Sequence, residues 1–536
     1  MAQEIAVDNS ATRSESHSAA SPSIAPASPA ATTHATTTSP GEETRSRQDA
    51  PRKRWLVIGG GVMGLQVATD LIDRGQDVTI AEAAPTMGGL TSAWKLGECT
   101  WDRYYHVTLL SDTKLRDMLG RLGLESTMKW VETKTGFYAD GRLHSMSNTA
   151  EFLKFPPLNL IEKLRLGGTI FYASKIRNWR RLEKLTVEKW LRRWSGNGVF
   201  RKIWQPLLQA KLGDAYQQTS AAFIWAHTAR MYKARRSGMK TEMFGYVPGG
   251  YAQVLETWVQ WLRDRGATMM TGSPVQCVES ARGESAHGQP APGQSARGES
   301  SRGQSSRGKT PPTHNAGSNP GQLTVHIGGQ PSGETRQENF DCVVSTIASP
   351  MIAKQCPQLS EDEKSRHRGI RYLGVVCASM LLNKPISPYY VTNITDTWVP
   401  LTGIIEMSTI VSPDEELGGH HLVYLPKYLA DDHEGLNESD ADYQEKCLST
   451  LEKMYDHFSR DQVIDFKIAR TKYVAALSTV DYSTRLPDVV SSVPGFYALN
   501  SAHIVKGNLN VNETITLGEE KMIEEVWPDF LARFHC

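Results

Sequence analysis

Residues 55–64 read WLVIGGGVMG, an apolar run that leads directly into three glycines. The spacing Gly59-x-Gly61-x-x-Gly64 follows an expected strand and opens an expected helix at about residues 62–74. In such a turn Gly59 permits the tight bend, Gly61 lets the backbone approach a pyrophosphate, and Gly64 allows the helix to pack closely. The helix N-terminus, at Val62 and Met63, would add N–H donors and a partial positive charge. This stretch predicts a dinucleotide-binding α/β unit.

The next strand and turn indicate which dinucleotide binds. The expected strand Val78–Glu82 ends on an acidic residue 18 positions after Gly64, where a carboxylate can accept both ribose hydroxyls of an adenosine. The sequence AAPTMGGLTSAW follows, with a second glycine pair, Gly88 and Gly89, and then Leu90. An NAD-dependent dehydrogenase has no need of a second glycine turn here. FAD is longer and buries its pyrophosphate between two such loops, so the pattern favours FAD.

At this point the chain resembles a known family. VIGGGVMG followed by VTIAEAAPTMGGLTSAW is similar to the FAD-binding signature of the flavin amine oxidase superfamily. That group includes monoamine oxidases, protoporphyrinogen oxidases, phytoene-desaturase-like enzymes and, more remotely, UDP-galactopyranose mutases. Three later segments are similar to family elements: YVPGG at 246–250 with a helix and Val275, DCVVST at 341–346, and GFYALN at 495–500. The resemblance implies further FAD contacts from Val275, Asn500, Asn512 and Thr514.

Two departures from the family pattern concern the same cofactor. Leu90 stands where an arginine usually follows the second glycine pair, so one phosphate contact is missing. Leu499-Asn500 stands where the family often has Gly-Asp. No cysteine lies near Ser501 at the place of the covalent attachment in monoamine oxidases, which implies a non-covalent FAD.

The expected fold is α/β, with a Rossmann-like FAD-binding domain interleaved with an α+β substrate domain. Residues 1–50 are poor in large apolar side chains, and residues 280–322 contain an imperfect pentapeptide repeat that begins at Glu279. We expect both to be disordered, the repeat as a lengthened turn of a β-hairpin. The expected parts are a tail at 1–50, FAD-binding segments at 51–130, 244–347 and 471–536, a helical substrate segment at 131–243 and a sheet segment at 348–470.

Candidate catalytic residues are weak. Tyr105 and His106, within DRYYH, lie where family members approach the flavin ring, although a packed tyrosine and a satisfied core histidine explain them equally well. Hydride transfer to flavin needs mainly orientation and desolvation, so no catalytic base is nominated. The sequence predicts no metal site.

Two functions remain open at this stage, besides a non-catalytic flavin scaffold. The first is an oxidoreductase of the amine oxidase or protoporphyrinogen oxidase type, which moves a hydride from an organic substrate to flavin N5 and is reoxidised by oxygen or a quinone. The second is a redox-neutral flavoenzyme similar to a UDP-galactopyranose mutase.

The net charge of +1 conceals two opposed regions. Residues 163–240 hold 18 lysines and arginines against 3 acids, and residues 412–465 hold 4 against 14. The basic helical segment 160–194 suits a peripheral membrane contact, an anionic or lipophilic small-molecule substrate, or a solvated face matched by the acidic stretch. Nucleic acid is not expected, because no binding module accompanies the charge. The N-terminus lacks an apolar signal region and the seven cysteines lack metal-ligand spacing, so a cytoplasmic protein with reduced thiols is expected.

Overall fold

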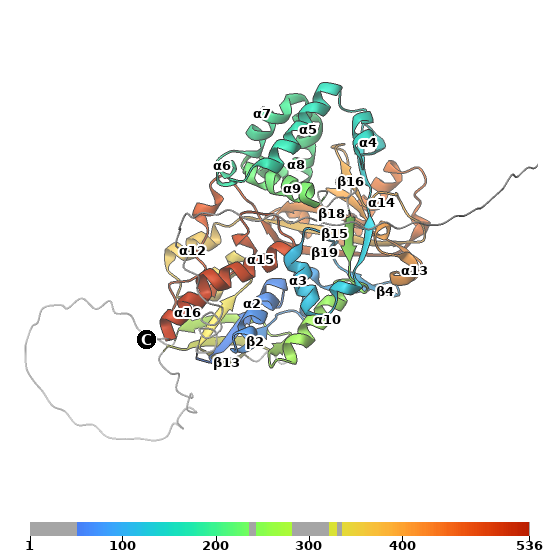
Figure 1. Ribbon diagram of the computed structural model, residues 1–536. Coiled ribbons are helices and arrows are strands. Elements are labelled where there is room, and N and C mark those ends of the chain that lie inside the picture. The colour runs from blue at the N-terminus through green and yellow to red at the C-terminus, as the bar shows by residue number, and fades with distance from the viewer. Residues whose placement is uncertain (1–50, 235–242, 281–320, 330–334, 535–536) are drawn as a thin grey trace, which may run out of the picture. The chain divides into compact units, whose positions relative to one another are not determined.

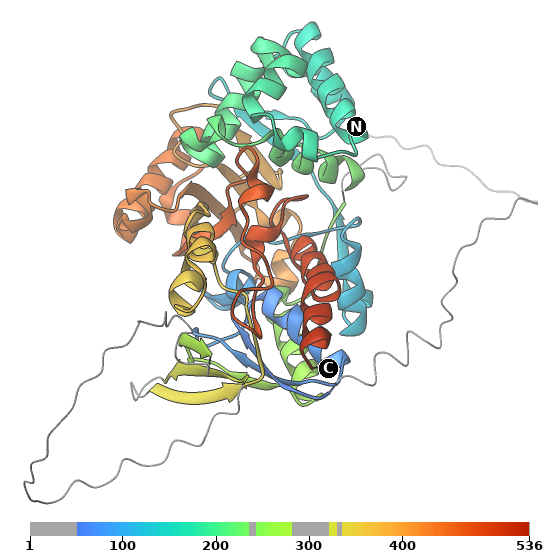
Figure 2. The same cartoon turned by 90° about the vertical axis from the view of Figure 1, so that its left-hand side faces the viewer.

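The computed structural model describes residues 51–234, 243–280, 321–329 and 335–534. Of residues 231–234 it describes the backbone alone. The predicted tail at 1–50 and almost all of the repeat insert lie outside these residues. The fold within 50–536 is built around two sheets and a group of helices (Figures 1 and 2).

The first sheet carries the glycine motif. It has five parallel strands in the order β10-β2-β1-β14-β20, drawn from parts of the chain far apart in sequence. Four of the five residues of β1 are buried, as its apolar sequence predicts for a central parallel strand. The strands are β1 (Arg54–Ile58), β2 (Asp77–Ala81), β10 (Thr268–Met270), β14 (Cys342–Ser345) and β20 (Phe496–Ala498).

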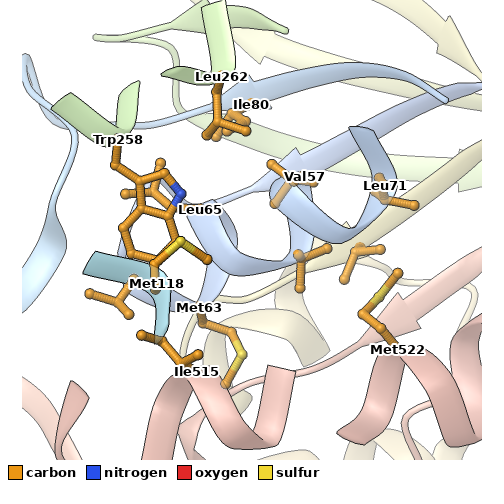
Figure 3. Close-up of a cluster of buried hydrophobic side chains, with 14 of the residues drawn as sticks. Val57, Met63, Leu65, Leu71, Ile80, Met118, Trp258, Leu262, Ile515 and Met522 are labelled. Carbon is orange, nitrogen blue, oxygen red and sulfur yellow. The ribbon is translucent and has the colours of Figure 1, made fainter. Parts of the chain in front are cut away.

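Successive residues of β1 point to opposite faces of this sheet, and each face has its own cover. Trp55 and Val57 face helices α2 (Val62–Asp73), α10 (Gly250–Arg263), α15 (Val511–Lys521) and α16 (Trp527–Phe534). Figure 3 shows part of this core, with Val57 and Ile80 of the sheet beside helix residues such as Trp258. Leu56 and Ile58 face a smaller antiparallel sheet of β11 (Val275–Ser280), β12 (Leu323–Gly328) and β13 (Thr335–Phe340).

The small sheet confirms one prediction about the repeat insert. Strands β11 and β12 pair in antiparallel register, from Val275 opposite Ile327 to Ser280 opposite Leu323. The repeat therefore connects two adjacent hairpin strands.

The second sheet has seven strands in the order β19-β15-β18-β17-β16-β7-β8. Its interior strand β15 is buried at all eleven residues. One face of the sheet packs on α14 (Asp440–Met454), and the other packs on side chains of β4 and β9. The strands are β7 (Thr135–Ala139), β8 (Arg142–Ser145), β15 (Tyr372–Leu382), β16 (Val391–Ile394), β17 (Gly403–Glu406), β18 (His421–Ala430) and β19 (Val463–Ala476).

A group of helices packs on the second sheet through a shared apolar cluster that includes Leu373 and Leu477 (Figure 1). The helices are α5 (Leu160–Lys175), α6 (Arg180–Glu183), α7 (Val187–Val199), α8 (Gln205–Leu212) and α9 (Ala221–Ala234). The predicted helical stretch 160–194 is thus divided among three helices. The last of them begins at a new N-cap, Thr186, whose hydroxyl accepts the N–H of Lys189.

The remaining longer elements connect these layers. They are β3 (Ala93–Leu96), β4 (Cys99–Asp102), β5 (Thr108–Leu109), β6 (Lys129–Glu132), β9 (Met243–Tyr246), α3 (Thr113–Arg121), α4 (Thr149–Lys154), α11 (Ser349–Gln355), α12 (Glu361–Arg368) and α13 (Pro413–Glu416). Among the described helices, none combines the length and the apolar character that crossing a bilayer requires.

Candidate functional site

The first glycine turn has the backbone that its spacing predicts. Gly59 has φ +102°, a conformation that side chains disfavour. A Cβ on Gly64 would lie 1.9 Å from the carbonyl oxygen of Gly59, so only glycine lets α2 approach β1 this closely. Helix α2 starts at Val62 after Gly61, without a side-chain cap on its N-terminus. Its first turn therefore keeps the polar end that favours an anion.

The second glycine turn lies against the first. The Gly88 N–H donates to the Gly60 carbonyl at 2.8 Å, and Gly89 has φ +56°. A Cβ on Gly61 would meet nothing nearer than the Gly89 Cα at 4.0 Å, and a Cβ on Gly89 would lie 3.3 Å from the Gly61 Cα. The two turns pack directly against each other through backbone, and the glycines at their junction carry no side chain that would keep a ligand away from it. Leu90 continues this turn as part of a short 3-10 helix.

Glu82 holds the first glycine turn in place and fixes the start of the segment that leads to the second. Its carboxylate accepts the Gly60 N–H at 2.7 Å and the Ala84 N–H at 2.8 Å. A carboxylate has about four acceptor positions, so roughly two remain for ribose hydroxyls. Gly60 was not predicted as a site residue, yet a Cβ there would lie 2.1 Å from the Met87 sulfur. The unbroken run of three glycines was the available signal.

The C-terminal candidates divide into two groups. Asn512 and Thr514 lie in the first turn of α15, where the Asn512 side chain accepts the Leu115 N–H at 3.2 Å and ties α15 to α3. Asn500 is almost fully buried and its amide is used inside the protein, donating to the Ser349 hydroxyl and accepting the Ala502 N–H. Asn500 would therefore need to exchange these bonds before it could contact a cofactor through its side chain.

Val275 begins strand β11, and its carbonyl oxygen accepts the side-chain amide of Gln355 at 3.1 Å. Ser273, two residues before Val275, donates its N–H to the Glu82 carbonyl. The structure thus brings the end of β2 and the start of β11 together, although they are far apart in sequence.

Tyr105 and His106 enter two different clusters. The Tyr105 hydroxyl lies 3.0 Å from that of Tyr428 on β18, and burial raises the Tyr105 pKa well above its usual value. Tyr105 is therefore a neutral hydrogen-bonding group rather than a base. The ammonium of Lys211 lies 4.5 Å from the centre of the Tyr428 ring. Neither Tyr428 nor Lys211 belongs to a motif, so sequence reasoning had no signal for them.

His106 lies beside a buried carboxylate. Its Nδ1 is 3.7 Å from Asp102 Oδ2, and Asp102 Oδ1 accepts the Tyr251 N–H at 2.9 Å. Burial raises the Asp102 pKa, while the His106 ring and the Tyr251 N–H oppose the rise. These side chains line a cavity of about 20 Å³, roughly the space of one water molecule.

A second polar cluster joins α9 to the N-terminus of α15. Arg230 donates to Asp112 Oδ2 at 2.8 Å, and burial raises the pKa of Glu513 nearby while Arg230 opposes the rise. His227, one turn earlier on α9, is exposed. Within the described ranges no group of three or more potential metal ligands occurs.

Comparison with known proteins agrees with this geometry. The sequence profile of the flavin-containing amine oxidoreductases matches residues 64–291. A probable zeta-carotene desaturase from Synechococcus elongatus is 22% identical over 249 residues, which are 42% of this chain and 51% of that protein. A carotenoid phi-ring synthase from Chlorobaculum tepidum is 26% identical over 137 residues, 23% of this chain and 20% of that protein. The chain spans about half the length of the desaturase and a fifth of the synthase.

Solved structures show the same fold. A putative protoporphyrinogen oxidase from Exiguobacterium has a TM-score of 0.63 at 16% identity, covering 89% of this chain and 99% of that one. Putrescine oxidase bound to putrescine has a TM-score of 0.62 at 14% identity, with coverage of 89% and 99%. The profile match over residues 64–291, the shared fold and the glycine geometry make this chain similar to the flavin-containing amine oxidoreductases.

Proposed function

We propose that this chain is an FAD-dependent oxidoreductase that takes a hydride from an organic substrate onto flavin N5, with oxygen or a quinone as the final acceptor. The observation that carries the proposal is the pair of glycine turns that face each other at Gly61 and Gly89, next to Glu82. The names of the similar proteins span polyene, tetrapyrrole and amine chemistry, so they support the reaction type more than one substrate.

We propose that the FAD is held non-covalently along the carboxyl ends of the first sheet. The glycine turns and the α2 N-terminus would bind the pyrophosphate, and Glu82 the ribose. The N-terminus of α15 would stabilise negative charge on the flavin. The proposed contacts are Gly59, Gly61, Val62, Met63, Gly64, Glu82, Gly88, Gly89, Leu90, Val275, Asn500, Asn512 and Thr514.

When bound, the flavin supplies the hydride acceptor, and the chain supplies orientation and a dry environment. Tyr105 and Tyr428, whose hydroxyls lie within hydrogen-bonding distance, would form an aromatic wall. The raised pKa of Tyr105 keeps that side chain uncharged, so it can pack on an apolar substrate without adding a competing base.

The substrate class is proposed from the same wall. The tyrosine rings suit a lipophilic body. Lys211 lies over Tyr428, and in the described part of the chain no carboxylate forms an ion pair with it, which suits an anionic substituent. We further propose that segment 160–194 brings the protein to a membrane surface, where lipophilic substrates reside.

The experiment is reconstitution of the purified chain with FAD, followed by anaerobic mixing with polyenes, amines and reduced tetrapyrroles. A true substrate bleaches the flavin absorbance, and oxygen or a quinone restores it. A chain that binds no FAD would refute the proposal. The alternative is a redox-neutral enzyme similar to a sugar-nucleotide mutase, and turnover only after prior flavin reduction would favour it.

A further inference from the structure

Helix α5 carries an exposed apolar surface that no part of the described chain covers. Of the eleven large apolar side chains that are exposed among the described residues, seven lie between residues 153 and 194. Leu160, Ile161 and Leu164 in the first turns of α5 are 65%, 70% and 66% exposed. Side chains of this size usually lie inside a protein, and clusters of them on a surface mark a binding face.

This face lies on a firmly anchored helix. Asn159 and Glu162 form a capping box at its N-terminus, and Lys163 donates to the Leu153 carbonyl at 2.8 Å. Leu166 and Ala173 on the opposite side of α5 are buried against the neighbouring helices. The exposed leucines therefore result from how α5 packs and not from a loose helix end.

Aromatic side chains extend the apolar face toward the C-terminus of α5. Phe171 and Tyr172 are exposed, and the Tyr172 ring lies 4.1 Å from that of Trp194 on α7, centroid to centroid. The ammonium of Lys175 lies 5.1 Å from the centre of the Phe171 ring. We call these side chains the α5 face: Leu160, Ile161, Leu164, Phe171, Tyr172 and Trp194.

Cations surround the α5 face, and the acidic stretch does not neutralise them. Arg165, Lys175, Arg177 and Arg193 are exposed, and across the described residues none of them forms an ion pair. In the basic stretch 163–240 the described ion pairs run from Arg192, Lys202 and Arg230 to Glu188, Glu162 and Asp112. None reaches 412–465, whose pairs involve Lys129, Arg371, Lys446, Arg460 and Arg470. These ion pairs therefore do not support the interpretation that the acidic stretch 412–465 neutralises the basic region 163–240.

We infer that the α5 face inserts into the interfacial layer of an anionic bilayer, while the surrounding arginines and lysines contact the headgroups. This inference rests on the proposed membrane contact and assigns its lipid-inserting part to α5. Leucine and aromatic side chains lower their free energy in that layer, and basic side chains are attracted to anionic lipids. Insertion adds an apolar contribution that salt does not screen, whereas the contribution of the cations falls as salt rises.

The test is co-sedimentation of the full-length, FAD-loaded protein with two kinds of vesicle, pure phosphatidylcholine and phosphatidylcholine with one third phosphatidylserine, at low and high salt. The test variant is L160S/I161S/L164S, and its matched control is M351S/I523S, which removes exposed apolar side chains on other helices. All five side chains are exposed, so both variants should fold. Melting temperature and bound FAD check this.

The wild type and the control should bind serine-containing vesicles and keep part of that binding at high salt. The triple variant should bind at least about tenfold more weakly at high salt, because three large side chains no longer enter the lipid. A triple variant that binds like the wild type would overturn the assignment to α5 and leave the membrane contact standing. No vesicle binding by the wild type would instead refute the membrane contact itself. A dimer that only the triple variant dissociates would show that a second copy covers the face.

Discussion

Replacing Gly61 by alanine tests the glycine cradle without disturbing the fold. Gly61 has φ −75°, which alanine adopts freely, and its Cβ would meet nothing nearer than 4.0 Å, the ordinary contact distance to the Gly89 Cα. Replacing glycine by alanine at a helix N-cap lowers the free energy of unfolding by a few tenths of a kcal/mol to about 1 kcal/mol. Alanine also restricts the unfolded chain, which raises the free energy of unfolding by about 0.4–1 kcal/mol. The FAD-free protein should therefore keep its stability within about 1 kcal/mol.

FAD binding should respond very differently. The new methyl group would stand at the junction of the two glycine turns, beside which we place the pyrophosphate. Losing one or two charge-assisted hydrogen bonds to phosphate removes roughly 1.5–3 kcal/mol each, which weakens FAD binding at least roughly tenfold.

The assay pairs two measurements on each protein, the thermal midpoint without FAD and the FAD dissociation constant from flavin fluorescence. Gly75→Ala is the control for a glycine-to-alanine change in a turn away from the proposed FAD site. Gly75 lies in the turn after α2, and no atom lies within 4 Å of its Cβ position. Its positive φ of +71° predicts lower stability with unchanged FAD affinity. Equal FAD affinity of Gly61→Ala and wild type would refute our placement of the pyrophosphate.

Three further outcomes follow from the contacts. Gly64→Ala places a Cβ 1.9 Å from the Gly59 carbonyl, so the FAD-free protein should lose more than about 3 kcal/mol of unfolding free energy in a denaturant titration. Glu82→Gln should weaken FAD binding about tenfold, as isothermal calorimetry would record, because a neutral amide accepts ribose and backbone donors less strongly. Burial raises the pKa of Glu406 from 4.5 to about 7, so its neutral form is favoured in the fold, and the stability that it contributes is lost as pH rises from about 4.5 to about 7. Glu406→Gln should flatten that part of the denaturation profile by about 2–3 kcal/mol, and an unchanged slope would contradict the assignment.

The sequence predicted the conformation of the first glycine turn, and the cofactor contacts assigned to it stay predictions. Gly59 and Gly64 have roles that follow from local sterics, because Gly59 has a positive φ and a Cβ on Gly64 would strike the nearby Gly59 carbonyl. Gly61 instead meets Gly89, which lies far along the chain. The parallel strands and the hairpin around the repeat insert follow from apolar alternation and run length, which are also local signals.

Other features followed from packing rather than from spacing. The helical stretch 160–194 is broken after Lys175 and again after Glu183, and its three helices pack over the second sheet in one apolar cluster. Asn500 fits the family pattern by position, yet its amide is already held by Ser349 and Ala502. Neither result could be read from periodicity, since both depend on partners far away in the chain.

By itself, the sequence determined that this chain builds a two-turn glycine cradle at the edge of a parallel sheet, because short-range sterics and apolar spacing leave few other conformations. Only the tertiary structure decided which side chains meet there and which remain free. Tyr105 lies beside Tyr428, 323 residues away, and the cations around α5 have no acidic partner among the described residues. Contacts between residues far apart in the chain depend on how the layers pack on one another. That packing is set by the burial of many apolar side chains together and not by any local stretch of sequence.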